Sequence, residues 1–164
     1  MTKTATGKVV IGKKVPDFKA VTTDGNEWRL KEAAGSNVVL FFYPKDMTPG
    51  CTIEAQEFRD LQAQFRRAKT QVVGISRDSC TSHQKFRTKE NLNYELLSDE
   101  EESLCKLFDV IREKNMYGKK VFGIERSTFL IGADGLVKEE WRGLKVPGHV
   151  EEVLKAVKAL KKAA

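Results

Sequence analysis

The chain has 164 residues, 40% of them hydrophobic and 32% charged, which suits one globular domain with a sizeable core. No apolar run approaches the ~20 residues of a membrane span, and the polar N-terminus lacks the apolar segment of a secretory signal. The net charge of +6 is spread along the chain without a nucleic-acid motif, so it favours a lysine-rich solvated surface over a nucleic-acid partner.

These features predict a single domain over residues 1–164, with residues 1–7 flexible, in a reducing cytoplasm and without a membrane partner. The first elements are predicted from turn signals and apolar runs. Asp24-Gly25 marks a tight turn and gives an N-terminal β-hairpin. The elements expected here are a short strand at 8–11, the hairpin strands at 19–22 and 26–29, one helical turn at 30–34, and a buried strand at 37–43.

The middle of the chain alternates strands and helices. A helix from about 49 to 67 carries Phe58, Leu61 and Phe65 at helical spacing, which indicates a face turned to the core. Because helices join the successive strands, we expect these strands to be parallel. The further elements are strands at 71–76 and 94–97, a helix at 79–90, and a short helix with apolar residues 104, 107, 108 and 111.

The last third of the sequence is predicted to form a loop, a second hairpin and a terminal helix. Residues 112–124 are rich in basic residues and glycine and are interpreted as a loop. Strands at 126–131 and 136–141 flank a Gly-Ala-Asp-Gly turn, and an apolar stripe begins at Val150. The order of elements predicts an α/β fold with a central mixed sheet flanked by helices.

The stretch after the strand at 37–43 has the signals of a helix start with a cysteine on it. Thr48 is a good N-cap, Pro49 suits the first helical position, and Glu54 favours the positive end of the helix dipole. Cys51 would be the third helical residue, among backbone N–H groups that favour a thiolate. The alternative is a small buried hydrophobe, for which Thr-Pro-Gly is a poor setting.

The other cysteines, Cys80 and Cys105, do not form a Cys-x-x-Cys pair or a metal-ligand pattern with Cys51. Cys80 falls near a predicted helix start, and Cys105 flanks an apolar stripe and is expected in the core. The two histidines, His83 and His149, are interpreted as surface or capping residues.

The spacing Pro44-x-x-x-Thr48-x-x-Cys51 matches the active-site pattern of peroxiredoxins. The run from Phe42 to Thr52 resembles the peroxiredoxin Q branch, also called bacterioferritin comigratory protein. The resemblance spans about residues 8–160, and its distant matches include the stretches 74–78, 97–99, 118–120 and 123–131.

This resemblance implies a thioredoxin-like fold and a thiol-dependent peroxidase that reduces hydrogen peroxide and organic hydroperoxides without a cofactor or metal. Cys51 would attack the peroxide and become a sulfenic acid. Thr48 and Arg126 would hydrogen-bond the peroxide oxygens, and Pro44 would cover the site. A surface role for Arg126 is the alternative, and its matched sequence context argues against it.

The sequence departs from the branch where a second, resolving cysteine is expected. Gln56 stands five residues after Cys51, and Arg87 stands about 36 residues after it. We therefore predict a one-cysteine mechanism in a monomer, with thioredoxin, glutaredoxin or glutathione as the reductant. The alternatives are an atypical two-cysteine cycle through Cys80 and a general thiol–disulfide oxidoreductase.

Overall fold

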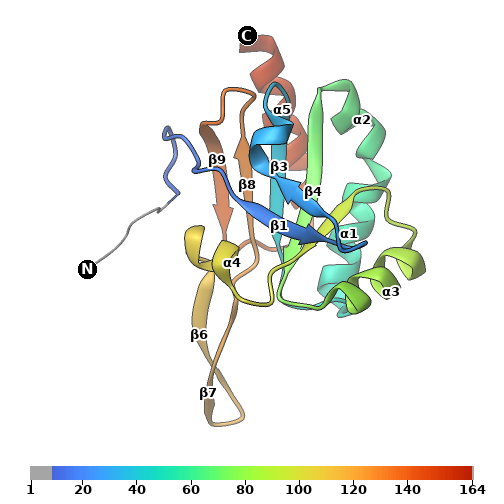
Figure 1. Ribbon diagram of the computed structural model, residues 1–164, viewed down its shortest axis with the longest axis vertical. Helices are drawn as coiled ribbons and strands as arrows, with labels where there is room; N and C mark the ends of the chain where they lie inside the picture. The colour runs from blue at the N-terminus through green and yellow to red at the C-terminus, as the bar shows by residue number, and fades with distance from the viewer. Residues whose placement is uncertain (1–8, 164) are drawn as a thin grey trace.

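A seven-stranded mixed sheet with the order β2-β1-β5-β4-β3-β8-β9 forms the centre of the structure (Figure 1). The computed structural model describes residues 9–163, so the predicted flexibility of residues 1–7 lies outside the described residues. The strands of this sheet are β1 (Lys19–Thr22), β2 (Glu27–Arg29), β3 (Asn37–Phe42), β4 (Thr70–Ser76), β5 (Glu95–Ser98), β8 (Ser127–Ile131) and β9 (Val137–Arg142).

The pairing of these strands follows the connections between them. β4 is parallel to both β3 and β5, as the intervening helices require. The β1–β2 and β8–β9 pairs are antiparallel hairpins, and β8 pairs antiparallel with β3. The predicted α/β class, parallel core and both hairpins are therefore confirmed.

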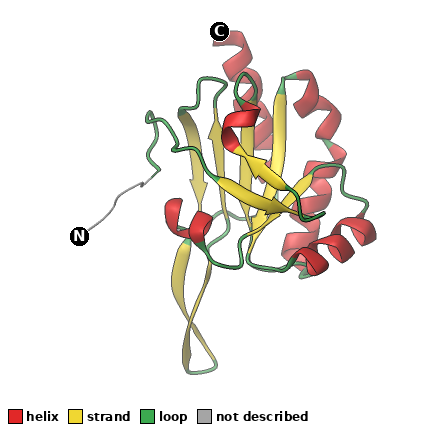
Figure 2. Cartoon of the chain, in the orientation of Figure 1, coloured by secondary structure: helices red, strands yellow, loops and turns green. Residues whose placement is uncertain are grey.

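Helices cover both faces of the sheet (Figure 2). Residues alternate along β3, so Val39 and Phe41 pack under α1, α2, α3 and α5, whereas Leu40 and Phe42 join the opposite core with α4 and η2. The helices are η2 (Leu30–Ala33), α1 (Pro49–Asp60), α2 (Gln62–Arg67), α3 (Cys80–Glu90), α4 (Ser103–Leu107) and α5 (His149–Ala163). Between residues 9 and 163, no helix combines the length and apolarity needed to cross a membrane.

Three sequence predictions were wrong in detail. Residues 9–11, the described part of the strand expected at 8–11, form no strand. The helix expected over 49–67 is interrupted at Leu61, whose φ of −98° and ψ of 6° leave the helical range. The stripe assigned to the short helix ends earlier, because Ile111 belongs to the next strand.

The largest difference is at residues 112–124, which form a two-stranded hairpin instead of a loop. β6 (Ile111–Met116) and β7 (Lys119–Ile124) are joined by Tyr117 and Gly118, both with positive φ. Two successive residues with positive φ make a tight hairpin turn. This turn was not predicted from the sequence because Tyr is rare at a position with positive φ. The hairpin projects from the end of the molecule where α4 and the α1 helix start lie (Figure 1).

Candidate active site

The carboxyl end of β3 delivers the candidate nucleophile. Tyr43 continues the strand by donating its backbone N–H to the carbonyl of Ile75 at 3.0 Å, and α1 begins six residues later. Thr48 has the extended backbone of an N-cap, and its carbonyl accepts from the N–H of Thr52 at 2.9 Å. Cys51 is the third residue of α1, as predicted from the sequence.

Cys51 lies against the guanidinium of Arg126. A terminal N–H of Arg126 donates to the sulfur at an N–S distance of 3.3 Å, so residues 75 positions apart in the chain meet. The Cys51 residue is only 1% exposed, and it packs with Tyr43 and Phe58 in the core under the helices. The expectation that this helix start would not bury its cysteine was therefore wrong, because the first turn of α1 packs into the core on this face of the sheet.

Glu54 is a member of this site that the sequence analysis assigned only to the helix dipole. It is fully buried, and its Oε1 accepts from Arg126 at 2.8 Å. Burial raises the pKa of Glu54 from 4.5 to about 7, although the positive charge of Arg126 opposes the rise. Among the described residues, Oε2 of Glu54 has no hydrogen-bond partner. An acidic residue on the core-facing side of α1, three positions after Cys51, was the signal available in the sequence.

Arg126 therefore holds two partners at once. Burial disfavours its charge, but the carboxylate of Glu54 and the sulfur of Cys51 more than compensate, and the pKa of Arg126 is raised. Gly50 makes this approach possible. A Cβ at Gly50 would lie 3.1 Å from a terminal nitrogen of Arg126, closer than side chains normally pack.

Thr48 and Pro44 are half-buried residues of the loop that joins β3 to α1. The Thr48 hydroxyl makes no capping hydrogen bond and instead donates to the carbonyl of Lys45 at 2.8 Å. Its lone pairs are thus left to accept from another group. Pro44 is half-buried and supplies no N–H at the strand end. The structure therefore brings Pro44, Thr48, Cys51 and Arg126 to one end of the sheet.

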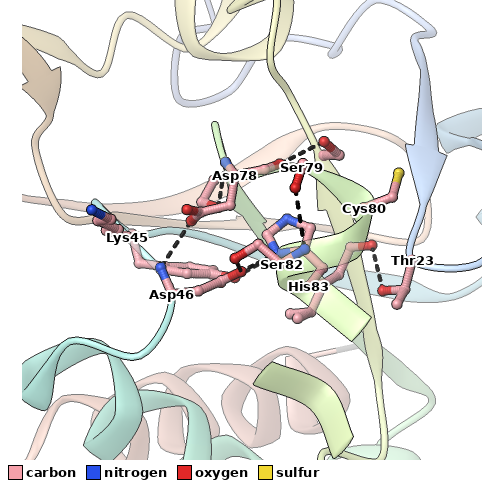
Figure 3. Close-up of polar contacts among 12 residues, drawn as sticks. Thr23, Lys45, Asp46, Asp78, Ser79, Cys80, Ser82 and His83 are labelled. Atoms are coloured by element: carbon pink, nitrogen blue, oxygen red, sulfur yellow. Dashed lines mark hydrogen bonds and ion pairs between the residues drawn. The ribbon is translucent and has the colours of Figure 1, made fainter. Parts of the chain in front are cut away.

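The two histidines are buried, so their assignment to the surface was wrong. His83 is 0% exposed and contacts Asp46, which lies in the loop between β3 and α1 and was not predicted to be a site residue (Figure 3). His149 does begin α5, but its ring contacts the Thr128 hydroxyl at 2.9 Å in the interior. Burial lowers the pKa of His149 from 6.5 to about 4, against the raising effect of Glu152.

The remaining cysteines lie apart from this arrangement. Cys80 begins α3 and is half-buried, with its sulfur 3.4 Å from the carbonyl oxygen of Thr22 on β1. Figure 3 shows its side chain turned toward β1, away from Asp46. Cys105 is buried in the opposite core, and burial together with Asp99 raises the pKa of its thiol far above its ordinary value. The predicted core position of Cys105 is confirmed.

Asp46, Asp78 and His83 bring donor atoms within 4.8 Å of one another. Each of these potential metal-ligand atoms already has a hydrogen-bond partner within the protein. The Asp46 carboxylate accepts from Tyr43 and His83, and Asp78 Oδ2 accepts from the Asp46 N–H and the Ser76 hydroxyl. We interpret this cluster as a hydrogen-bond network and not as a metal site.

Comparison with known proteins shows the family to which the chain belongs. Residues 11–140 match the model of the AhpC/TSA family. The chain is 48% identical to peroxiredoxin Bcp of Xanthomonas campestris over 87% of this chain and 89% of that protein, and 45% identical to peroxiredoxin Bcp of Bacillus subtilis over 92% and 96%. A Xanthomonas campestris peroxiredoxin Q structure superposes with a TM-score of 0.83, at 48% identity over 87% of this chain and 90% of that chain. A Xylella fastidiosa PrxQ mutant superposes with a TM-score of 0.89, at 43% identity over 93% and 98%.

Proposed function

This chain belongs to the AhpC/TSA family and is a thiol-dependent peroxidase of the peroxiredoxin class, and from this premise we propose that Cys51 is its peroxide-reducing residue. The observation that carries the proposal is the position of the Cys51 sulfur, on the first turn of α1 and 3.3 Å from an N–H of Arg126. A helix start and a guanidinium both favour the thiolate, which is the nucleophilic form of cysteine.

The proposed reaction uses the groups that converge on this sulfur. The Cys51 thiolate attacks one peroxide oxygen, an S–O bond forms, and the O–O bond breaks. The electron pair leaves on the second oxygen, which takes up a proton and departs as water or an alcohol, while Cys51 becomes a sulfenic acid. Arg126 donates to the peroxide oxygens and stabilises the charge that develops on the leaving oxygen.

Thr48 and Pro44 complete the proposed site. Because the Thr48 hydroxyl donates a hydrogen bond to the backbone carbonyl of Lys45, its lone pairs are free to accept a hydrogen bond from the O–H of a hydroperoxide. This contact would hold the peroxide in line with the sulfur. Pro44 restricts access at the strand end without adding a donor.

For the reductive half of the cycle, we propose a one-cysteine mechanism with an external thiol: thioredoxin, glutaredoxin or glutathione. Gln56 and Arg87 occupy the positions of the usual resolving cysteines. The alternative two-cysteine cycle through Cys80 has weak support, because the Cys80 sulfur contacts the carbonyl of Thr22 on β1 and not Cys51. We further propose a monomer that acts in the cytoplasm, where thiols such as the three free cysteines of this chain stay reduced.

Replacement of each cysteine by serine tests the assignment. We expect Cys51→Ser to abolish thiol-dependent consumption of hydrogen peroxide and organic hydroperoxides, and Cys80→Ser to retain it. Full peroxidase activity in Cys51→Ser would overturn the proposal. Insulin reduction without peroxide turnover would instead identify a general thiol–disulfide oxidoreductase.

Mass spectrometry after one equivalent of peroxide separates the two cycles. The one-cysteine mechanism predicts a sulfenic acid on Cys51 that dimedone traps. An intramolecular disulfide between Cys51 and Cys80 would establish the two-cysteine alternative in its place. Parallel assays with thioredoxin, glutaredoxin and glutathione then identify the reductant.

A further inference from the structure

A cluster of buried polar groups lies directly beneath the loop that carries Thr48. Asp46 is 5% exposed and His83 is 0% exposed. Asp46 Oδ2 lies 2.8 Å from His83 Nδ1 and 2.8 Å from the Ser82 hydroxyl, and Oδ1 lies 2.6 Å from the Tyr43 hydroxyl. The backbone N–H of Asp46 donates to Asp78 at 2.8 Å (Figure 3). The loop is thus joined to α3 and to the ends of β3 and β4.

The two ring nitrogens of His83 both face oxygens that accept hydrogen bonds. Nδ1 faces the Asp46 carboxyl, and Nε2 lies 3.1 Å from the carbonyl oxygen of Leu97 on β5. A carbonyl only accepts, so Nε2 must carry a proton. One more proton is needed between Nδ1 and Asp46, since two lone pairs at 2.8 Å would repel each other.

The other partners of Asp46 place this second proton on the histidine. The carboxyl group accepts from the hydroxyl of Tyr43 on Oδ1 and from the hydroxyl of Ser82 on Oδ2, so both of its oxygens act as acceptors, as those of a carboxylate do. Burial and the charge of Asp46 raise the pKa of Tyr43 well above its ordinary value, so the phenol stays protonated and remains a donor. A negative Asp46 therefore faces a positive, doubly protonated His83.

We propose that the buried Asp46–His83 ion pair is a positioning device for the peroxidase site, which holds the loop so that Thr48 faces Cys51. This inference rests on the proposed function of Thr48. Met47, between Asp46 and Thr48, has a φ of 64°, a left-handed conformation that is strained for residues other than glycine. Such a conformation persists only where its surroundings fix it. Asp46 fixes one side and the start of α1 fixes the other.

The energetics of the pair favour a role in geometry over one in stability. Burying two charges costs desolvation energy that their attraction seldom exceeds, so an apolar pair could serve the core as well. A buried pair with directional hydrogen bonds instead selects one loop conformation. His83 and Asp46 are not expected to touch the peroxide, and they act through Thr48 two residues beyond Asp46.

Nitrogen NMR of the histidine rings tests the ion pair without turnover. The chain has two histidines, and His149 is an internal reference, because its lowered pKa of about 4 leaves it neutral at pH 7. We expect two ring N–H protons on His83 and one on His149 at pH 7, with signals assigned by the His149→Gln variant. Asp46→Asn should convert His83 to the singly protonated ring, since an amide N–H can donate to Nδ1. A neutral His83 in the unmodified protein would overturn the inference.

Stopped-flow kinetics test the positioning role. We expect Asp46→Asn and His83→Gln to lower the second-order rate constant of Cys51 with hydrogen peroxide by about 10- to 100-fold, the scale of a misplaced catalytic group. The exposed Asp60→Asn variant, which loses the same charge, should keep the normal rate. If Asp46→Asn does not fold, Ser82→Ala removes one hydrogen bond to Asp46 and should lower the rate constant several-fold.

A normal rate constant in a folded Asp46→Asn protein, or in Ser82→Ala if it alone folds, would overturn the positioning role. A purely structural role would lower the unfolding midpoint and leave the rate constant of the folded protein unchanged. Failure of the proposed function is distinguishable from both results. It would appear as an unmodified protein that consumes no peroxide, whereas ring protonation is measured independently of activity.

Discussion

The buried carboxyl of Glu54 makes the stability of this protein depend on pH in a direction opposite to that of most carboxylates. Its pKa rises from 4.5 to about 7 on folding, because it is fully buried and Arg126 compensates only part of the desolvation. The unfolded chain releases this proton near pH 4.5, whereas the folded chain keeps it until about pH 7. The contribution of Glu54 to stability is therefore complete below pH 4.5 and is lost as the pH rises through 7.

The magnitude follows from the two pKa values. Each tenfold change in proton affinity is worth about 1.4 kcal/mol, so the full loss between acid and alkaline pH is about 3 kcal/mol. Glu54→Gln removes the titration and retains an amide that can contact Arg126. We expect the variant to gain about 2 to 3 kcal/mol in unfolding free energy relative to the unmodified protein between pH 5 and pH 8.

Urea unfolding of both proteins at pH 5 and pH 8 measures this difference, because the other titrating groups are common to both and cancel. Glu32→Gln, an exposed position on η2, controls for loss of one negative charge. An equal free-energy difference between Glu54→Gln and the unmodified protein at both pH values would show that Glu54 does not lose a proton on unfolding in this range.

Three further outcomes are expected. Gly50→Ala should lower the rate constant of Cys51 with peroxide by about tenfold without unfolding the protein. The added Cβ would lie 3.1 Å from a terminal nitrogen of Arg126 and would displace the guanidinium from the Cys51 sulfur, and stopped-flow fluorescence measures the rate constant. The unmodified protein should lose about 3 kcal/mol of unfolding free energy as the pH falls through 6.5 toward 4, because the His149 ring takes up a proton near pH 6.5 only in the unfolded chain. His149→Gln should abolish this loss, and urea unfolding of both proteins at pH 7 and pH 4.5 measures the difference. Phe58→Ala should destabilise the fold by about 3 to 5 kcal/mol in thermal or urea unfolding. The Phe58 ring stacks on Phe41 with a distance of 4.5 Å between the ring centroids, and its removal leaves a cavity under α1.

The elements that follow local rules were predictable from the sequence. The apolar run of β3, the Thr-Pro start of α1 and the Asp-Gly turn of the first hairpin each depend on neighbouring residues alone. Cys51 was placed correctly on its helix for the same reason. The β6–β7 hairpin escaped prediction because its strands are mostly exposed and do not alternate between apolar and polar residues, so neither periodicity nor a common turn pair marks it.

The polar interior could not be predicted in the same way. Arg126 entered the candidate site through the resemblance to a family and not through its local sequence. Glu54 and Asp46 become buried because their partners arrive from 72 and 37 residues away, and only the tertiary fold decides that meeting. Sequence rules assign most charged residues to the surface, which is correct unless a partner of opposite charge is buried with them.

The two buried acids flank Cys51 on either side along the chain, and this arrangement bears on how a reductant reaches the sulfur. Cys51 is 1% exposed, so the external thiol of the proposed one-cysteine mechanism would reach the sulfur only if the first turn of α1 opened. Opening that turn breaks the contact between Cys51 and Arg126. Asp46 lies before Thr48 and binds α3, so it is not part of the turn that moves. We therefore expect the Asp46 network to keep the start of the loop in place during such an opening, so that Thr48 would return to the same position when the turn closes.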